Sequence, residues 1–265
     1  MIDYHLHTKR CGHATGLPED YILRAEAIGL QEIGFSDHFP LGLLGYTPKA
    51  KVTMESEELA DYIQDIEKLK EQARIMKVKV GIEIDYFPEA EEKIGRLLEE
   101  YAFDYVIGSI HFIGDWDFTH PAYAEEYRNL DIDRLYVDYF ELIEKACRSR
   151  LFDIIGHIDV IKKFGYRPGT DPGLLWLKIA CVLRETGTCI ELNTSGRDAP
   201  VGEFYPHQPL LEACLAERVP LTLGSDAHSP EQVGRYFPEA KSLLSEIGCR
   251  ELAIFENRVR SSVAL

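Results

Sequence analysis

The chain has 265 residues, of which 45% are hydrophobic and 28% charged, and its formal net charge is −16. This length and apolar fraction suit one large α/β domain with a sizeable core, and the acidic balance argues against a nucleic-acid-binding surface. No apolar run approaches the ~18 residues of a membrane-spanning helix, and the first residues lack the basic and apolar stretches of a secretory signal. We therefore expect a cytoplasmic protein with six reduced cysteines and with neither a nucleic-acid nor a membrane partner.

Short apolar, β-branched segments alternate with amphipathic segments along the chain. The first kind is typical of buried parallel strands, which we expect at 2–4, 32–36, 79–84, 105–110, 152–156, 188–193 and 220–224. The second kind has helical spacing and predicts helices over 18–28, 56–76, 89–101, 133–149, 173–186, 208–217 and 230–247. No linker or internal repeat interrupts the seven units. They predict a single domain over residues 1–265 with a barrel-like closure.

Seven of the nine histidines stand where a predicted strand ends or in the loop after it, together with several acids. The carboxyl ends of the strands are where βα barrels carry their chemistry. Neutral imidazoles and carboxylates bind divalent metals, and so many of them predict more than one ion. Imidazole-rich ligation favours zinc, iron or manganese over magnesium or calcium, without choosing among the three. In chain order these residues are His5, His7, His13, Asp37, His38, Glu83, Asp85, His111, His157, Asp159, Asp226 and His228.

Arg197 and His207, which follow the sixth predicted strand, are candidates for contacts to an anion. The Arg197 guanidinium could fork onto a phosphate, and the alternative is a surface ion pair with Asp198. His207 could touch a phosphate or a leaving group, and the alternative is a histidine in a loop or at a helix cap.

The histidine and acid motifs, in this order, resemble those of the PHP superfamily (polymerase and histidinol phosphatase domain). They read HLH at 5–7, FSDH at 35–38, GIEIDY at 81–86 and GSDAH at 224–228. Three more segments resemble the histidinol-phosphate phosphatases within it: YVIGSIHFI at 105–113, GHIDVIK at 156–162 and ELNTSGR at 191–197. The resemblance extends from residue 3 to about 258.

The resemblance implies a distorted (β/α)7, TIM-like barrel with its active site at the carboxyl ends of the strands. It also implies three divalent ions of zinc, iron or manganese, with Glu83 bridging two of them. The implied ligand groups are His5, His7, Glu83 and Asp226 for one ion, Glu83, His111 and His157 for another, and His13, His38 and His228 for a third.

The implied activity is hydrolysis of L-histidinol phosphate to L-histidinol and phosphate, a late step of histidine biosynthesis, by a metal-bridging hydroxide. A PHP phosphoesterase acting on phosphotyrosine or nucleotides is the alternative, and a catalytically idle metal-bound module is a third reading. The sequence leaves the oligomeric state open.

We expect catalytic roles for Glu83 and Asp226, and for Asp37 an orienting or proton-shuttling role. Substrate contacts are expected from Arg197 and His207, and also from Asp85 and Asp159, whose carboxylates could meet the ammonium group of the substrate. Asp159, two residues beyond a predicted ligand, is also expected to orient an imidazole.

Overall fold

Seven parallel strands form the central sheet of the computed structural model, which describes residues 1–73 and 75–265. Their order is that of the chain, and the sheet nearly closes because Leu6 and Ala227 form a parallel bridge. The Ala227 N–H donates to the His5 carbonyl at 3.0 Å, and the His7 N–H donates to the Ala227 carbonyl at 3.0 Å. The predicted seven-stranded, barrel-like fold is thus confirmed. The strands are β1 (Ile2–Leu6), β2 (Glu32–Phe35), β3 (Lys77–Asp85), β4 (Tyr105–Ser109), β7 (Ile154–Ile155), β8 (Cys189–Asn193) and β9 (Leu221–Gly224).

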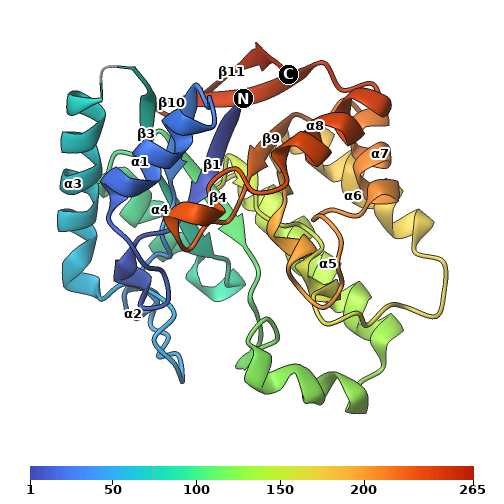
Figure 1. Cartoon of the computed structure of the whole chain (residues 1–265). Coiled ribbons are helices and arrows are strands. Elements are labelled where there is room, and N and C mark those ends of the chain that lie inside the picture. The colour runs from blue at the N-terminus through green and yellow to red at the C-terminus, as the bar shows by residue number, and fades with distance from the viewer. Residues whose placement is uncertain (74) are drawn as a thin grey trace.

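Helices surround the sheet, with α3 on one flank and α5, α6 and α7 on the other (Figure 1). None of those in the described ranges is both long and apolar enough to cross a membrane. The helices are α1 (Pro18–Ala27), α2 (Leu41–Leu44), α3 (Leu59–Gln72), α4 (Glu91–Glu100), α5 (Ile132–Ser149), α6 (Gly173–Thr186), α7 (Gln208–Ala216) and α8 (Phe237–Glu246).

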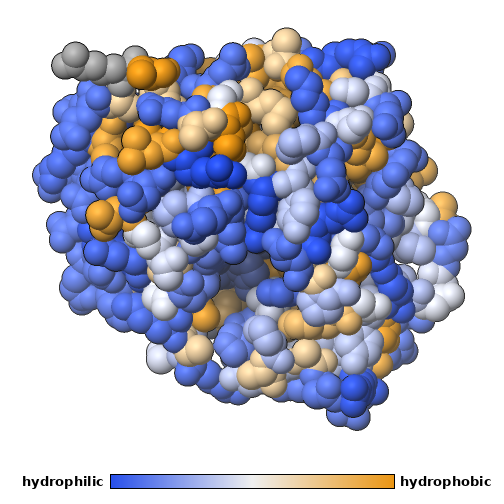
Figure 2. All heavy atoms as spheres, viewed as in Figure 1, coloured by the Kyte–Doolittle hydropathy of each residue, from blue (hydrophilic) through white to orange (hydrophobic). Residues whose placement is uncertain are grey.

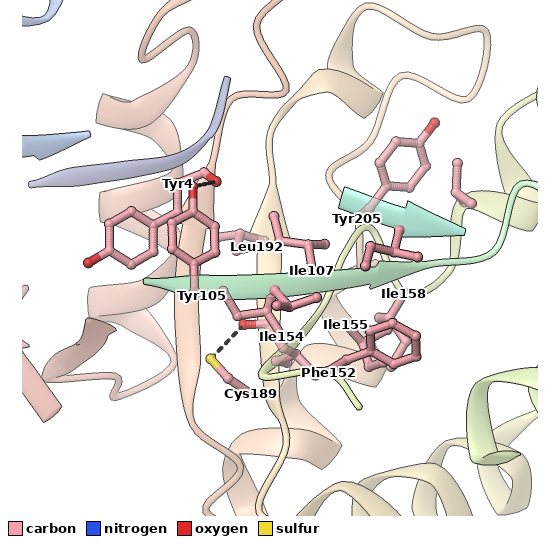
Figure 3. Packing of buried hydrophobic residues seen from close by; sticks show 14 of the residues in the cluster. Tyr4, Tyr105, Ile107, Phe152, Ile154, Ile155, Ile158, Cys189, Leu192 and Tyr205 are labelled. Atoms are coloured by element: carbon pink, nitrogen blue, oxygen red, sulfur yellow. Dashed lines mark hydrogen bonds between the residues drawn. The ribbon is translucent and has the colours of Figure 1, made fainter. Parts of the chain in front are cut away.

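The amino-terminal half of the barrel is filled by large side chains, and glycines on neighbouring strands make room for them. Tyr105 stacks on Tyr4 with ring centroids 4.7 Å apart, and its hydroxyl donates to the Tyr4 carbonyl at 2.6 Å. A Cβ atom on Gly34 would lie 2.1 Å from the Tyr105 hydroxyl, and one on Gly81 would lie 2.2 Å from the ring. Figure 3 shows Tyr4 and Tyr105 side by side within the buried cluster. This packing fixes the mutual positions of β1, β2, β3 and β4.

A C-terminal antiparallel hairpin, which the sequence interpretation missed, consists of β10 (Glu251–Glu256) and β11 (Val259–Ala264). The Phe255 N–H donates to the Tyr4 hydroxyl at 3.1 Å, and its ring lies 6.4 Å from that of Tyr105. Both chain termini lie near this hairpin (Figure 1). The hairpin therefore packs at the amino-terminal end of the barrel, which leaves the carboxyl end for the site.

The helix expected over 230–247 is shorter than predicted. Pro230–Gln232 forms a 3-10 turn, and the α-helix begins only at Phe237. Between them, Gly234 and Tyr236 have φ values of +65° and +59°, in the left-handed region that an α-helix excludes.

The helix expected over 56–76 is likewise shorter. A 3-10 turn at Ser56–Glu58 precedes α3, which ends at Gln72, and Arg74 lies outside the described residues.

Two elements in the loop after β4 were not predicted. A short hairpin pairs β5 (Phe112–Ile113) with β6 (Trp116–Asp117), and 3-10 turns cover Pro121–Asn129. Both lie in the connection to α5 and bring residues to the carboxyl end of the barrel.

Candidate metal centre

The first group of predicted ligands converges at the ends of β1, β3 and β9. His5 Nε2 lies 3.3 Å from Glu83 Oε2, and His7 Nε2 lies 3.7 Å from the same oxygen. Asp226 Oδ1 lies 3.2 Å from His7 Nε2 and 4.0 Å from His5 Nε2. One divalent ion could be reached by all four side chains, because these atoms surround a single small space.

A second group shares the other oxygen of the same carboxylate. Glu83 Oε1 lies 3.0 Å from His157 Nε2 and 3.8 Å from His111 Nε2, and the two imidazole nitrogens are 3.2 Å apart. Glu83 therefore has one oxygen in each group, the arrangement expected of a bridging ligand.

The third group combines a loop after β1 with residues beyond β2 and β9. His13 Nε2 and His228 Nε2 are 2.9 Å apart, and the His13 and His38 ring centroids are 5.4 Å apart. His38 Nδ1 also lies 2.9 Å from Glu83 Oε2, so this imidazole adjoins the first group. The structure thus brings all nine predicted ligands into one cluster. Their assignment to particular ions stays a prediction.

Several features of the cluster fit bound cations. His5 Nε2, His7 Nε2 and Glu83 Oε2 are buried, and although other ligand atoms lie close, none has a partner with hydrogen-bond geometry within the described residues. Buried polar atoms without partners are rare in native proteins, and a metal ion would supply the missing partner. Asp226 and His157 also have φ values of +53° and +22°, the kind of backbone strain that concentrates at functional sites.

Acids behind the imidazoles hold the rings in place. Glu191 Oε1 lies 2.7 Å from His5 Nδ1, Asp85 Oδ1 lies 2.9 Å from His111 Nδ1, and Asp37 Oδ1 lies 3.5 Å from His7 Nδ1. A carboxylate on the far nitrogen fixes the tautomer and directs the other nitrogen to a metal. Asp37 Oδ1 accepts from the His38 N–H at 2.9 Å, and His7 Nδ1 has no hydrogen-bond partner within the described residues, so both expected roles of Asp37 stay predictions. Asp85, expected to meet the substrate, is instead engaged with an imidazole.

Glu191 was missed by the sequence interpretation. It lies on β8, and its Oε2 accepts from the His157 N–H at 2.9 Å and from Asn193 Nδ2 at 3.0 Å. Gly224 on the next strand leaves it room, because a Cβ atom there would lie 1.8 Å from Glu191 Oε1. The available signal was a carboxylate between Ile190 and Leu192 in a fully buried strand.

Burial and neighbouring charges shift the pKa values of several side chains in the cluster. Burial acts to raise the pKa of Glu83, but the His38 and His5 imidazoles hold that pKa well below its usual range. Burial, together with the His38 and His7 imidazoles, lowers the pKa of His13 to about 4. Burial acts to lower the pKa of His111, but Asp85 raises it to about 9. Near pH 7, therefore, Glu83 is ionised and His13 is neutral, while His111 would release a proton on binding a cation.

A cavity of about 520 Å³ opens over the cluster. Figure 2 shows one face of the molecule hollowed near its centre, with hydrophilic residues around the hollow. Besides the predicted site residues, the lysines, arginines and acids that line the cavity are Lys51, Lys163, Arg235, Asp117 and Asp198. Arg235 is held in place, because it donates to the Ser225 and Asp226 carbonyls and to Asp198 Oδ2, each at 2.9 Å.

Arg197 does not line this cavity. Its guanidinium donates to Glu239 Oε2 at 2.5 Å and to the Gly202 carbonyl at 3.1 Å, and it packs over the Phe204 ring. The expected phosphate contact is therefore not supported by its position. A surface ion pair was the stated alternative, although the partner is Glu239 and not Asp198.

His207 and Asp159 bind each other outside the cavity lining. Asp159 Oδ2 accepts from the His207 N–H at 2.9 Å, lies 3.1 Å from its Nδ1, and forms a buried ion pair with Lys162 at 2.8 Å. Neither residue reaches the metal cluster, and the imidazole that Asp159 contacts belongs to His207 and not to a predicted ligand. The expected substrate contacts of both residues are not supported by this arrangement.

Comparisons with known proteins agree with this geometry. A family model described as the PHP domain matches residues 3–195. The chain is 37% identical to a probable histidinol-phosphatase of Deinococcus radiodurans, over 98% of both chains. It is 29% identical to a histidinol-phosphatase of Bacillus subtilis, over 88% of this chain and 95% of the relative.

A crystal structure of histidinol phosphate phosphatase from Lactococcus lactis, complexed with zinc, L-histidinol and phosphate, superposes with a TM-score of 0.84. The two chains are 24% identical, and 98% of each is covered, so this likeness shows that the fold is shared. With the family model and the near full-length relatives, it leads to one conclusion: the chain belongs to the PHP family.

Proposed function

We propose that the protein is a metal-dependent phosphomonoesterase that hydrolyses L-histidinol phosphate to L-histidinol and phosphate. The observation that carries the proposal is the convergence of nine imidazole and carboxylate side chains in one cluster, seven of which line one cavity. The substrate follows from relatives named histidinol-phosphatase at 26–37% identity over most of their length. The whole chain, residues 1–265, would then act as one cytoplasmic catalytic domain.

Three divalent ions are proposed for the three groups of ligands, with Glu83 shared between two of them. Zinc is named in the Lactococcus lactis structure, and iron and manganese suit the same imidazole-rich ligands. When bound, such ions supply a hydroxide near neutral pH and neutralise charge on the phosphoryl oxygens. The protein itself would orient the ligands, through Glu191 at His5 and Asp85 at His111.

Lys163 is proposed as the cation that meets the phosphate, in place of Arg197. It lines the cavity, and no carboxylate lies within 4.0 Å of its ammonium group in the described part of the chain. Burial lowers the pKa of Lys163, while the charges of Asp226 and Asp117 act to raise it. An unpaired ammonium beside the cluster would gain from a dianionic ligand.

A substrate panel with metal-loaded protein tests this function. We expect kcat/KM for L-histidinol phosphate to exceed that for phosphotyrosine and for a mononucleotide, and metal analysis to give about three divalent ions per chain. If a rival substrate matched L-histidinol phosphate, the alternative of a PHP phosphoesterase acting on phosphotyrosine or nucleotides would replace the named substrate. Absence of activity on all three would refute the phosphatase proposal itself.

A further inference from the structure

The carboxylates that line the cavity are not equally engaged. Four of the five lie within 4.0 Å of a basic group. Glu83 and Asp226 lie beside predicted ligand imidazoles, Asp85 lies beside His111, and Asp198 pairs with Arg235. The fifth, Asp117, has no such partner in the described ranges 1–73 and 75–265. The cavity thus carries, on its wall, one carboxylate without a close ion-pair partner among the described residues.

The backbone around Asp117 holds it next to the cluster. In the β5–β6 hairpin Asp117 pairs with Phe112, the residue after the predicted ligand His111. The Phe118 N–H also donates to the His111 carbonyl at 3.2 Å. The Asp117 side chain is therefore placed by the same short segment that places one of the imidazoles.

The carboxylate is itself held rigidly. Asp117 Oδ1 accepts from the Thr119 N–H at 3.1 Å, the Thr119 hydroxyl at 2.9 Å and the His120 N–H at 3.1 Å. No hydrogen bond reaches Oδ2 from any described residue. One oxygen thus fixes the orientation, and the other is available to a ligand.

We propose that Asp117 is the specificity-determining residue that binds the ammonium group of the substrate's leaving alcohol. This inference rests on the proposed function, because L-histidinol phosphate carries an ammonium group near its phosphate. Lys163 and the bound cations draw in any phosphomonoester, so discrimination requires a group that prefers a cationic leaving group. Asp85 and Asp159, from which this role was expected, are occupied by His111 and Lys162.

The test compares two esters that differ only in the ammonium group: L-histidinol phosphate and the phosphate ester of 3-(imidazol-4-yl)propan-1-ol. Asp117→Asn keeps an oxygen for the Thr119 and His120 donors and removes the charge. We expect kcat/KM to fall roughly 10- to 150-fold for L-histidinol phosphate, the range of a lost charge-assisted hydrogen bond, and to stay unchanged for the amine-free ester. The inhibition constant of L-histidinol should rise by a similar factor.

Asp115→Asn is the matched control. Asp115 lies in the turn of the same hairpin, is exposed and does not line the cavity, so the same charge change should alter neither ester. An equal loss on both esters in Asp117→Asn, or no loss on either, would overturn the role of Asp117. The proposed function is judged separately, by whether the unaltered protein prefers L-histidinol phosphate to phosphotyrosine. Should that protein hydrolyse neither ester, both proposals would fall together.

Discussion

Replacing Glu191 by glutamine should weaken metal binding, although the residue itself touches no proposed ion. Its two oxygens accept from three donors: His5 Nδ1 at 2.7 Å, the His157 N–H at 2.9 Å and Asn193 Nδ2 at 3.0 Å. Asn193 cannot turn to compensate, because its own oxygen accepts from the Ser195 N–H and hydroxyl at 2.9 and 2.6 Å. The site therefore requires two acceptors, and an amide offers one.

Either orientation of the glutamine amide is damaging. If its NH2 group faces His157 and Asn193, donors meet donors and a buried N–H loses its partner, at about 1–3 kcal/mol. If the NH2 group faces His5, it donates to Nδ1, and the imidazole proton must then sit on Nε2, the nitrogen expected to bind a metal. Loss of such an orienting carboxylate typically costs about 10- to 100-fold in metal affinity, and we expect that range here.

The assay is a titration of metal-free protein with zinc in competition with a chromophoric chelator. Denaturant unfolding of the metal-free variant shows separately how much of the effect is a loss of stability. Glu92→Gln, on the exposed face of α4, is the matched control and should bind zinc like the unaltered protein. If Glu191→Gln bound zinc with undiminished affinity, the orienting role would be refuted.

Four further substitutions test other parts of the structure. Glu83→Gln should lower activity more than replacement of any single ligand histidine, because Glu83 contributes one oxygen to each of two ligand groups. Near-normal turnover and metal content in this variant would show that the metal site is not where we propose it. Lys163→Met should lower kcat/KM for phosphomonoesters roughly 10- to 150-fold with unchanged metal content. Arg197→Ala should change neither kcat/KM nor metal content. If Arg197→Ala lowered kcat/KM and Lys163→Met did not, Arg197 would be the phosphate-binding residue. Asp159→Asn should lower the free energy of unfolding by about 1–3 kcal/mol, because it removes the nearer of the two carboxylates beside the buried Lys162 ammonium and leaves only Glu203, at 3.5 Å. Metal content is the control, and an unchanged denaturation midpoint would contradict this prediction.

The seven strands and the residues at their ends could be predicted from the sequence. Buried parallel strands are short, continuous apolar runs, and their carboxyl ends all face one end of a barrel. His5, Glu83, His157 and Asp226 therefore had to lie near one another once the order of strands was known. The helix over 230–247 was predicted too long, because left-handed backbone at Tyr236 depends on its surroundings and not on helical spacing.

What the sequence by itself determined is thus the barrel, its catalytic end and the set of candidate ligands, because these follow from periodicity and chain direction. Only the tertiary structure decided which acid serves which partner. In the structure Glu191 contacts His5, Asp85 contacts His111, and Arg197 forms an ion pair with Glu239 outside the cavity. Such choices depend on side-chain directions and on room left by residues distant in the chain, which neither spacing nor composition encodes.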